Sequence, residues 1–373
     1  MNAKQGIFDA RQNNLDFLRL SLAILVILSH SFPLATGSEA NEPFILATHG
    51  QTTGGTIAVD LFFVLSGFLI TNSFLSSSSV WSYLGKRIRR IYPGFVATML
   101  VGALVVAPLA SASSPFHTAA AQLGNFVLSC LRLREFDYLH AFASNPAPGA
   151  INGSLWSISY EFWCYIGVAV LGLIGILARR RVVLGIFCLS LVVSLLFAIT
   201  GWAPGGSFLN PIFGFPPLWA RLLPMYLAGV VFFLHRDRIP LHGYLALGAL
   251  GALVVAAYIP LAWTVCFPVA GTYLLFWFGY HPGIRLTNFA KYGDFSYGTY
   301  LYAFPIQQLT MKFFGHPISP YLLSVIAVPL TLMAAILSWH LIEKRFVGSS
   351  AKVRRSEDIS QSSPKLASVA AGR

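Results

Sequence analysis

The sequence predicts an all-α, polytopic membrane protein with about ten transmembrane helices and with both termini in the cytoplasm. Of its 373 residues, 56% are hydrophobic and only 10% are charged, whereas soluble domains contain about 25% charged residues. Apolar stretches of about 17–25 residues recur along the chain, and each is long enough to cross a bilayer as a helix. These stretches lack the alternation of polar and apolar residues that is typical of membrane β-barrel strands.

Ten such stretches follow one another along the chain. The expected spans are residues 15–34, 56–75, 92–111, 155–178, 182–200, 218–234, 243–261, 263–279, 294–313 and 319–341. We expect them to form one membrane domain over residues 1–347. The remaining residues, 348–373, are polar and Ser-rich, and we expect them to form a disordered cytoplasmic tail.

Two of the connections have a distinctive composition. Residues 112–153 include TAAAQLGNFVLSCLRL, for which we expect a short helix that lies on or re-enters the membrane face. Residues 201–217, GWAPGGSFLNPIFGFPP, are rich in Gly, Pro and aromatic residues, so we expect a non-helical loop suited to a lid or a binding surface. The four cysteines have no CxxC spacing, and we expect neither a disulfide framework nor a metal site.

The basic residues divide unequally between the two sides of the membrane that these spans imply. With the N-terminus inside, twenty of the 25 Lys and Arg residues fall in inner segments and only Arg132 and Arg134 in outer loops. Arg19, Arg221 and Lys312 fall within spans or at their edges. The positive-inside rule then places both termini in the cytoplasm. Because the basic residues are spread over six inner segments, we expect no nucleic-acid partner.

The first span, LDFLRLSLAILVILSHSF, carries Arg19 and His30 on nearly the same helix face. Eleven residues at a rise of 1.5 Å separate them by roughly 16 Å, with Arg19 near the cytoplasmic edge and His30 in the outer half. Arg19 can be explained as a helix-end arginine that snorkels to the interface. An ionisable residue at the depth of His30 is costly and points to a function.

Two further carboxylates are predicted at a depth similar to that of His30. Asp60 lies in the outer third of the second span, where a carboxylate can orient an imidazole and raise its basicity. Glu161 lies about two turns into the fourth span, again in the outer half. We therefore predict a reaction centre formed by His30, Asp60 and Glu161. In the second span, Ser66 and Gly67 permit close approach of a neighbouring backbone, and packing explains them as well as function does.

A dense group of basic residues precedes the expected third span, in the segment GKRIRRIYPGF. Lys86, Arg87, Arg89 and Arg90 occupy four of five positions, and Pro93 is expected in the first turn of the helix. The positive-inside rule explains any one of these cations. Four together also favour a binding site for phosphates on the cytoplasmic face.

These motifs resemble the membrane acyltransferase-3 family. Arg19 and His30 match its Arg-x10-His pattern in the first helix, and FFVLSGFLIT, which contains Ser66 and Gly67, matches its Phe-Phe-x-x-Ser-Gly-Phe stretch. The order and spacing of the motifs cover most of the chain. The resemblance implies a ten-helix integral membrane protein that acylates sugars of surface polysaccharides, lipopolysaccharide, peptidoglycan or small molecules.

Later segments extend the resemblance. Arg87, Arg90 and Pro93 match a basic Arg-x-x-Arg-x-x-Pro segment, and Glu161 matches the acid of Leu-Trp-Ser-x-Ser-x-Glu. The segment FSYGTYLYAFPIQQ resembles a Ser-Tyr-x-x-Tyr-Leu motif, and LIEKRF resembles a closing Ile-Glu-Lys stretch. One departure is Ala303, where the family often has a His two residues before the Pro, so a role for that His cannot be transferred.

The resemblance implies an acyl donor, expected to be acetyl-CoA, that approaches from the cytoplasm as a co-substrate, with no metal. Its phosphates would be held bidentately by arginines. The residues expected to bind or line the path of this donor are Arg19, Arg87, Arg89, Arg90, Ser66 and Gly67. His30, oriented by Asp60 or Glu161, would act as a general base on the acceptor hydroxyl, or its imidazole would be acylated transiently.

The acceptor implied by the resemblance is a sugar hydroxyl of an extracytoplasmic or lipid-linked glycan. We expect a multi-pass protein of a bacterial inner membrane, surrounded by membrane lipid, with polysaccharide-assembly proteins as further partners. A secondary transporter for an anionic or sugar-like solute is the alternative, because transporters also use intramembrane ionisable residues. A non-catalytic partner in polysaccharide export is a third interpretation. The basic group at 86–90 favours the enzyme, because a transporter does not need it in that form.

Overall fold

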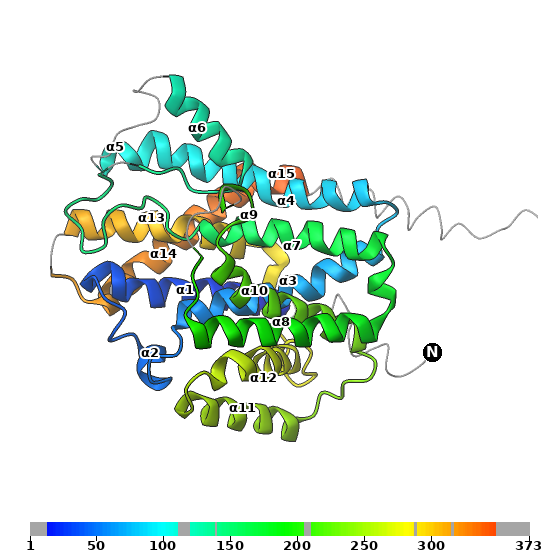
Figure 1. Ribbon diagram of the computed structural model, residues 1–373. Helices are drawn as coiled ribbons and strands as arrows, with labels where there is room; N and C mark the ends of the chain where they lie inside the picture. The colour runs from blue at the N-terminus through cyan, green and yellow to red at the C-terminus, as the bar shows by residue number, and fades with distance from the viewer. Residues whose placement is uncertain are drawn as a thin grey trace, which may run out of the picture.

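The computed structural model describes residues 13–110, 120–138, 140–204, 210–286, 289–314 and 317–347, in which every regular element is a helix. In Figure 1 the long helices run roughly side by side, with α11 and α12 at one edge of the bundle and α4, α5 and α6 at the opposite edge. The long elements are α1 (Leu15–Thr36), α3 (Gly54–Leu75), α4 (Val80–Val101), α7 (Trp156–Leu173), α8 (Arg180–Thr200), α10 (Pro216–His235), α11 (Gly243–Tyr258), α12 (Ala262–Gly279), α13 (Ser296–Phe314) and α14 (Pro320–Ser338).

Short elements complete the chain. They are α2 (Pro43–Ala47), η2 (Gly102–Val106), α5 (Ala107–Leu109), α6 (Ala120–Leu131), η3 (Ile176–Ala178), α9 (Asn210–Phe213), η4 (Phe289–Tyr292), η5 (Trp339–Glu343) and α15 (Lys344–Val347). The π-helical turns η2 and η5 continue α4 and α14 without a break, so two of the spans are rods that cover residues 80–109 and 320–347.

Each of the ten predicted spans falls on a long helix, but the count of ten membrane crossings is not confirmed. Within the described residues, eight helices are long and apolar enough to cross a membrane. The two that do not qualify are α11, which has only 16 residues, and α13. The protein is therefore all-helical with at least eight candidate spans, and which side of the membrane holds the termini stays a prediction.

The composition of α13 explains why it is less apolar than its neighbours. It buries polar residues, including Gln307 and Gln308. The Gln307 amide donates to the Ile27 carbonyl and to the Ser31 hydroxyl of α1, at 2.8 and 2.7 Å. Gln308 donates to the carbonyl of Ala147 at 2.7 Å. Because buried amides need such partners, α13 is an interior helix whose polar side chains fix its position against α1 and the loop before α7.

The third span begins much earlier than the sequence predicts. Helix α4 starts at Val80, where the hydroxyl of Ser79 accepts a hydrogen bond from the backbone N–H of Ser82. Pro93 therefore lies inside the helix, and its placement in the first turn was wrong. A Ser cap at the N-terminus of a helix supplies an acceptor for a backbone N–H that would otherwise lack one. As a consequence, the basic residues 86–90 lie on a helix and have fixed directions.

Helices α3 and α10 make the closest backbone contact in the bundle through two glycines. A Cβ on Gly67 would lie 2.0 Å from the carbonyl oxygen of Tyr226, and a Cβ on Gly229 would lie 2.0 Å from that of Val64. Small residues allow such an approach between membrane helices. Gly67 therefore has a packing role, which the sequence left open.

The two long connections differ in how well they follow prediction. The short helix expected within residues 118–133 is present as α6. The segment 201–217, expected to be non-helical, contains one helical turn, α9, so this expectation was wrong there. Residues 205–209 and the predicted tail 348–373 lie outside the described residues.

We expect Gly67→Ala to destabilise the protein strongly, because the added methyl group would force α3 and α10 apart. Overpacking of this kind typically costs about 1–3 kcal/mol or more. Thermal unfolding of the detergent-solubilised protein measures the effect. The matched control is Gly248→Ala in α11, where an added Cβ meets nothing within 4 Å. Equal melting temperatures for the two variants would contradict the packing role of Gly67 between α3 and α10.

Glu135, in the connection between α6 and α7, provides a test of pH dependence. Its carboxylate accepts a hydrogen bond from the backbone N–H of Asn152. Burial raises the pKa of Glu135 from 4.5 to about 7, and the hydrogen bonds from Asn152 and Ile151 limit that rise. Because the folded state then binds the proton more tightly than the unfolded chain, the contribution of Glu135 to stability is lost as the pH rises from 4.5 to about 7.

We therefore expect the melting temperature of the wild type to fall more between about pH 5 and about pH 8 than that of Glu135→Gln, whose side chain does not titrate. Thermal unfolding in detergent at both pH values measures the difference. Parallel pH profiles for the two proteins would rule out this origin of the pH dependence.

Candidate functional site

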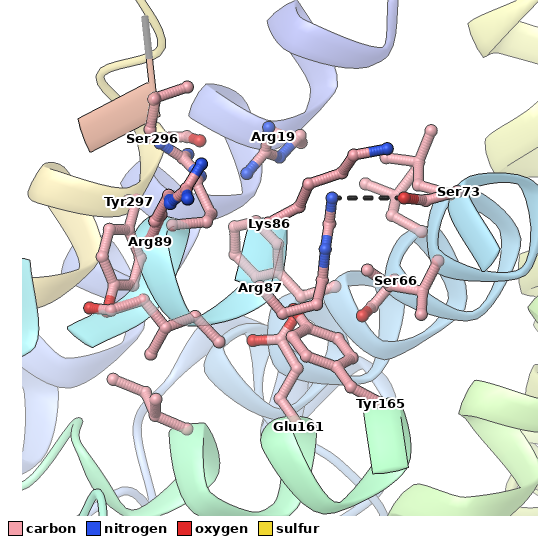
Figure 2. Close-up of a pocket in the computed structure, with 18 of the residues that line it drawn as sticks. Arg19, Ser66, Ser73, Lys86, Arg87, Arg89, Glu161, Tyr165, Ser296 and Tyr297 are labelled. Atoms are coloured by element: carbon pink, nitrogen blue, oxygen red, sulfur yellow. Dashed lines mark hydrogen bonds between the residues drawn. The ribbon is translucent and has the colours of Figure 1, made fainter. Parts of the chain in front are cut away.

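A cavity of about 980 Å³ opens between α3, α4, α7 and α13, and it contains the basic residues of α4. In Figure 2, Lys86 and Arg87 project from α4 toward this space, and Glu161 and Tyr165 face it from α7. Polar and charged side chains in its lining are Arg19, Ser66, Ser73, Ser76, Ser78, Ser82, Lys86, Arg87, Arg89, Arg90, Ser157, Glu161 and Ser296. Aromatic rings in the lining are Phe62, Phe63, Trp81, Tyr165, Tyr297, Tyr300 and Phe346.

Basic and hydroxyl side chains gather at the end of the cavity where α3 ends and α4 begins. The Arg87 guanidinium donates to the Ser73 hydroxyl at 3.3 Å, and Lys86 donates to the Ser77 hydroxyl at 3.2 Å. Arg89 is exposed. No ion pair with a carboxylate is found for Arg87 or Arg89 among the described residues. This end of the cavity therefore offers cations and hydroxyl groups to an anionic ligand.

Arg19 and Arg90 are already paired, with a carboxylate that sequence reasoning missed. Asp294, just before α13, accepts from Arg19 at 2.5 Å and from Arg90 at 2.6 Å. Arg90 also lies 3.5 Å from Glu343, which is buried. This group, which we call the Asp294 network, joins α1, α4, α13 and η5. Asp294 directly precedes the motif FSYGTYLYAF, and a carboxylate at the start of a span is the signal that could have revealed it.

Glu161 of α7 lies in the lining and accepts a hydrogen bond from the Tyr165 hydroxyl at 2.6 Å, and Figure 2 shows both side chains beside Arg87. Ser157 of α7 and Tyr300 of α13 line the cavity farther from the basic residues. The Tyr300 hydroxyl lies 2.6 Å from the Ser157 hydroxyl and donates to the carbonyl of Ser154 at 2.7 Å. The rings of Phe62 and Tyr300 meet at 6.1 Å. These side chains close the inner end of the cavity.

His30 lies beyond that closed end and not in the cavity lining. Its ring meets Phe304 edge-on at 5.8 Å, four residues after Tyr300 on α13. On its other side is α3, where a Cβ on Gly55 would lie 3.8 Å from the imidazole. The Nδ1 atom is buried and has no hydrogen-bond partner among the described residues. The imidazole is therefore partly buried between α3 and α13, with Nδ1 unpaired within the described part of the chain.

Asp60 has a partner different from the one that the sequence suggests. Its carboxylate accepts from Arg221 Nε at 3.0 Å and lies 2.9 Å from Arg221 Nη2. Asp60 faces α10, as Gly67 does, and neither lies in the cavity lining. The structure thus pairs Asp60 with Arg221 and not with His30. The described residues show no hydrogen bond or ion pair among His30, Asp60 and Glu161.

A family model for an acyltransferase domain, Acyl_transf_3, matches residues 12–342. The chain belongs to this acyltransferase family. It is therefore an acyltransferase that moves groups other than aminoacyl groups. The match spans the whole bundle, from the start of α1 to the end of η5.

Individual relatives agree with the family assignment. The O-acetyl transferase of Shigella phage Sf6 is 28% identical over 372 residues, which are 95% of this chain and 98% of the relative. The putative peptidoglycan O-acetyltransferase YrhL of Bacillus subtilis (strain 168) is 27% identical over 78% of this chain and 50% of its own length. No solved structure gives a significant match. These comparisons favour acyl transfer over the transporter interpretation.

We expect Asp294→Asn to lower the melting temperature by several degrees. Loss of this carboxylate would leave Arg19 without its partner and Arg90 with Glu343 alone. Because these side chains are half-buried, the cost lies between about 1 kcal/mol for an exposed pair and about 3–5 kcal/mol for a buried one. Thermal unfolding in detergent measures the loss. Asp237→Asn, in an exposed turn after α10, is the control and should leave the transition in place. An unchanged transition for Asp294→Asn would show that the network contributes little to stability.

Proposed function

We propose that this acyltransferase moves an acyl group, specifically acetyl, from cytoplasmic acyl-CoA to a sugar hydroxyl of an extracytoplasmic or lipid-linked glycan. The observation that carries the proposal is the cavity, which has cations at one end and closes near His30 at the other. The acetyl group is supported by the two relatives named O-acetyl transferase and peptidoglycan O-acetyltransferase. The location in a bacterial inner membrane is supported by the apolar helices and by the distribution of basic residues.

The phosphates of the donor bind at the basic end of the cavity. Lys86, Arg87 and Arg89 project from a single turn of α4, and arginine guanidinium groups can bind phosphate oxygens in a bidentate manner. Because Arg19 and Arg90 are held by Asp294, their role is to shape the donor path. This assignment agrees with the sequence-based expectation that Arg19 lines the path, and it differs for Arg90, which the sequence suggests as a direct phosphate ligand.

The pantetheine arm then extends along the apolar wall of α3 toward His30. Arg19 and His30 are eleven residues apart on α1, or roughly 16 Å. Phe62 and Tyr300 stand between the cavity and His30. The Tyr300 ring has to turn aside to let the thioester reach the imidazole. Glu161 and the Tyr300 hydroxyl, both in the lining, are placed to contact the thioester end of the donor.

The chemical step requires a base at the acceptor hydroxyl. The unprotonated imidazole of His30 removes the proton, and the acceptor oxygen attacks the thioester carbonyl carbon. The new C–O bond forms as the C–S bond breaks, and the CoA sulfur leaves and accepts the proton from the imidazole. In the two-step version, the imidazole itself is acylated first and the acceptor oxygen then attacks the acyl-imidazole.

Removing the cations should weaken donor binding. We expect CoA to raise the melting temperature of the detergent-solubilised wild type and to have at most a small effect on the double variant Arg87→Ala, Arg89→Ala. Each charge-assisted hydrogen bond contributes about 1.5–3 kcal/mol. The control is Arg180→Ala at the start of α8, outside the cavity lining. A full CoA response in the double variant would exclude this phosphate site.

Replacing His30 should leave binding of the donor intact and abolish most of the acetyl transfer. We expect His30→Ala to respond to CoA as the wild type does but to lose at least a hundredfold in acetyl transfer, the lower range for loss of a general base. The readout is acetyl incorporation into base-deacetylated polysaccharide from a deletion strain, measured by mass spectrometry. Wild-type transfer by His30→Ala would rule out the proposed role, and an acetyl adduct on His30 would select the two-step version.

A further inference from the structure

Arg221 is a cation within a candidate membrane span, α10. It lies in the second turn of α10, five residues after the helix begins at Pro216 and thus about 8 Å along its axis. It is not part of the cavity lining. Its only carboxylate partner among the described residues is Asp60 of α3. The pair lies at the end of the bundle that also contains His30, since α3 begins at Gly54 beside the imidazole.

Hydrogen bonds fix two nitrogens of the Arg221 guanidinium, Nε and Nη2, and none is found for Nη1 among the described residues. Nε and Nη2 bind the Asp60 carboxylate, and Nη2 also donates to the Thr56 carbonyl at 3.2 Å. These bonds leave the two N–H groups of Nη1 for a ligand. The Arg221 side chain is 31% exposed, while Asp60 is only 5% exposed. The exposed part of the salt bridge is therefore on the arginine and not on Asp60.

The guanidinium lies over one aromatic ring, Trp156, which begins a row of three rings from α7 and α10. Its central carbon lies 6.0 Å from the centre of the Trp156 ring at the start of α7. Tyr160 lies 5.9 Å from Trp156, and Trp219 of α10 lies 5.1 Å from Tyr160. The Tyr160 hydroxyl accepts from the backbone N–H of Phe215 at 2.6 Å, which fixes its ring. Trp156 and Trp219 are half-buried, so each has a part of its surface exposed.

Residues next to Trp156 and Thr56 in the sequence show where Arg221 and Trp156 lie relative to the donor cavity. Trp156 contacts Arg221, whereas the next residue, Ser157, lines the cavity and bonds Tyr300. On α3, the Thr56 carbonyl binds Arg221, whereas the preceding residue, Gly55, packs against His30. Trp156 is therefore the sequence neighbour of a residue that lines the cavity, and the backbone partner of Arg221 on α3 is the sequence neighbour of a residue that packs against His30.

We propose that Arg221 and Trp156 form the acceptor subsite, which binds a sugar ring of the glycan. In this subsite Nη1 donates hydrogen bonds to hydroxyl or carboxylate oxygens of the sugar, and the Trp156 ring stacks on its apolar C–H face. Asp60 is a positioning residue that fixes the guanidinium. The inference rests on the proposed function, because it needs an acceptor that arrives at the His30 end while the donor enters from the basic end.

The test is acetyl transfer from saturating acetyl-CoA to base-deacetylated polysaccharide from a deletion strain, with the polysaccharide concentration varied. We expect Arg221→Gln to raise the KM for polysaccharide at least tenfold and to change kcat much less. A tenfold change corresponds to 1.4 kcal/mol, within the range for a hydrogen bond to a charged group. Trp156→Leu should raise the same KM. In both variants CoA should still raise the melting temperature. Arg132→Gln, which removes an exposed cation from the α6–α7 connection, should leave both parameters unchanged.

A second variant keeps the test valid if Arg221→Gln fails to fold because Asp60 is left unpaired. The double variant Asp60→Asn, Arg221→Gln removes both charges, and we expect it to fold and to show the same rise in KM. A KM within twofold of wild type in either folded variant would overturn the subsite. A wild-type protein that neither responds to CoA nor transfers acetyl would instead overturn the proposed function.

Discussion

A single carboxylate, Asp294, holds the cytoplasmic half of the predicted pathway together. It neutralises Arg19 of α1 and Arg90 of α4, and Arg90 in turn approaches Glu343 in η5. Burial of an unpaired charge among apolar helices is costly, so these helices can enclose a polar cavity only while the pairs are intact. Among the described residues, Arg87 and Arg89 have no carboxylate partner at the basic end. Paired Arg90 and these two arginines therefore lie within one turn of α4.

The molecule has two polar regions with an aromatic partition between them. One is the donor cavity, and the other is the group around His30 and Arg221. Phe62 and Tyr300 form the partition. Under the proposed function, such an arrangement would keep the thioester away from water at the acceptor end until the Tyr300 ring moves, which would limit hydrolysis of the donor. Hydrogen bonds of its hydroxyl with Ser157 and Ser154 hold Tyr300 in the closed position, and they have to break for the ring to move.

Much of the helical plan could be predicted from the sequence, because long apolar stretches report directly on spans. The start of α4 could not, since its first turns, VWSYLGKRIRR, are too polar to be recognised as part of a span. The limited hydropathy of α13 has a similar cause, because residues such as Gln307 are satisfied by partners on another helix.

Prediction of the candidate site was less complete. Arg19, Arg87, Arg89 and Glu161 do share a cavity. The pairing of Asp60 with Arg221 joins residues 161 positions apart, and that of Arg19 with Asp294 joins residues 275 apart. Local sequence patterns carry no information about such pairs, because they depend on which helix faces pack together. His30 of α1 lies beside the start of α3 at Gly55, whereas Asp60 of α3 faces α10.

The reciprocal glycine contact between α3 and α10 has a mechanical consequence. With two backbones in direct contact at Gly67 and Gly229, neither helix can slide or rotate without carrying the other. Asp60 and Arg221 therefore travel as one rigid block that also carries Phe62. Any widening of the route to His30 has to come from the opposite wall, where Tyr300 and Phe304 lie on α13. The α3–α10 side of the passage is therefore the fixed wall, and α13 is the wall that moves.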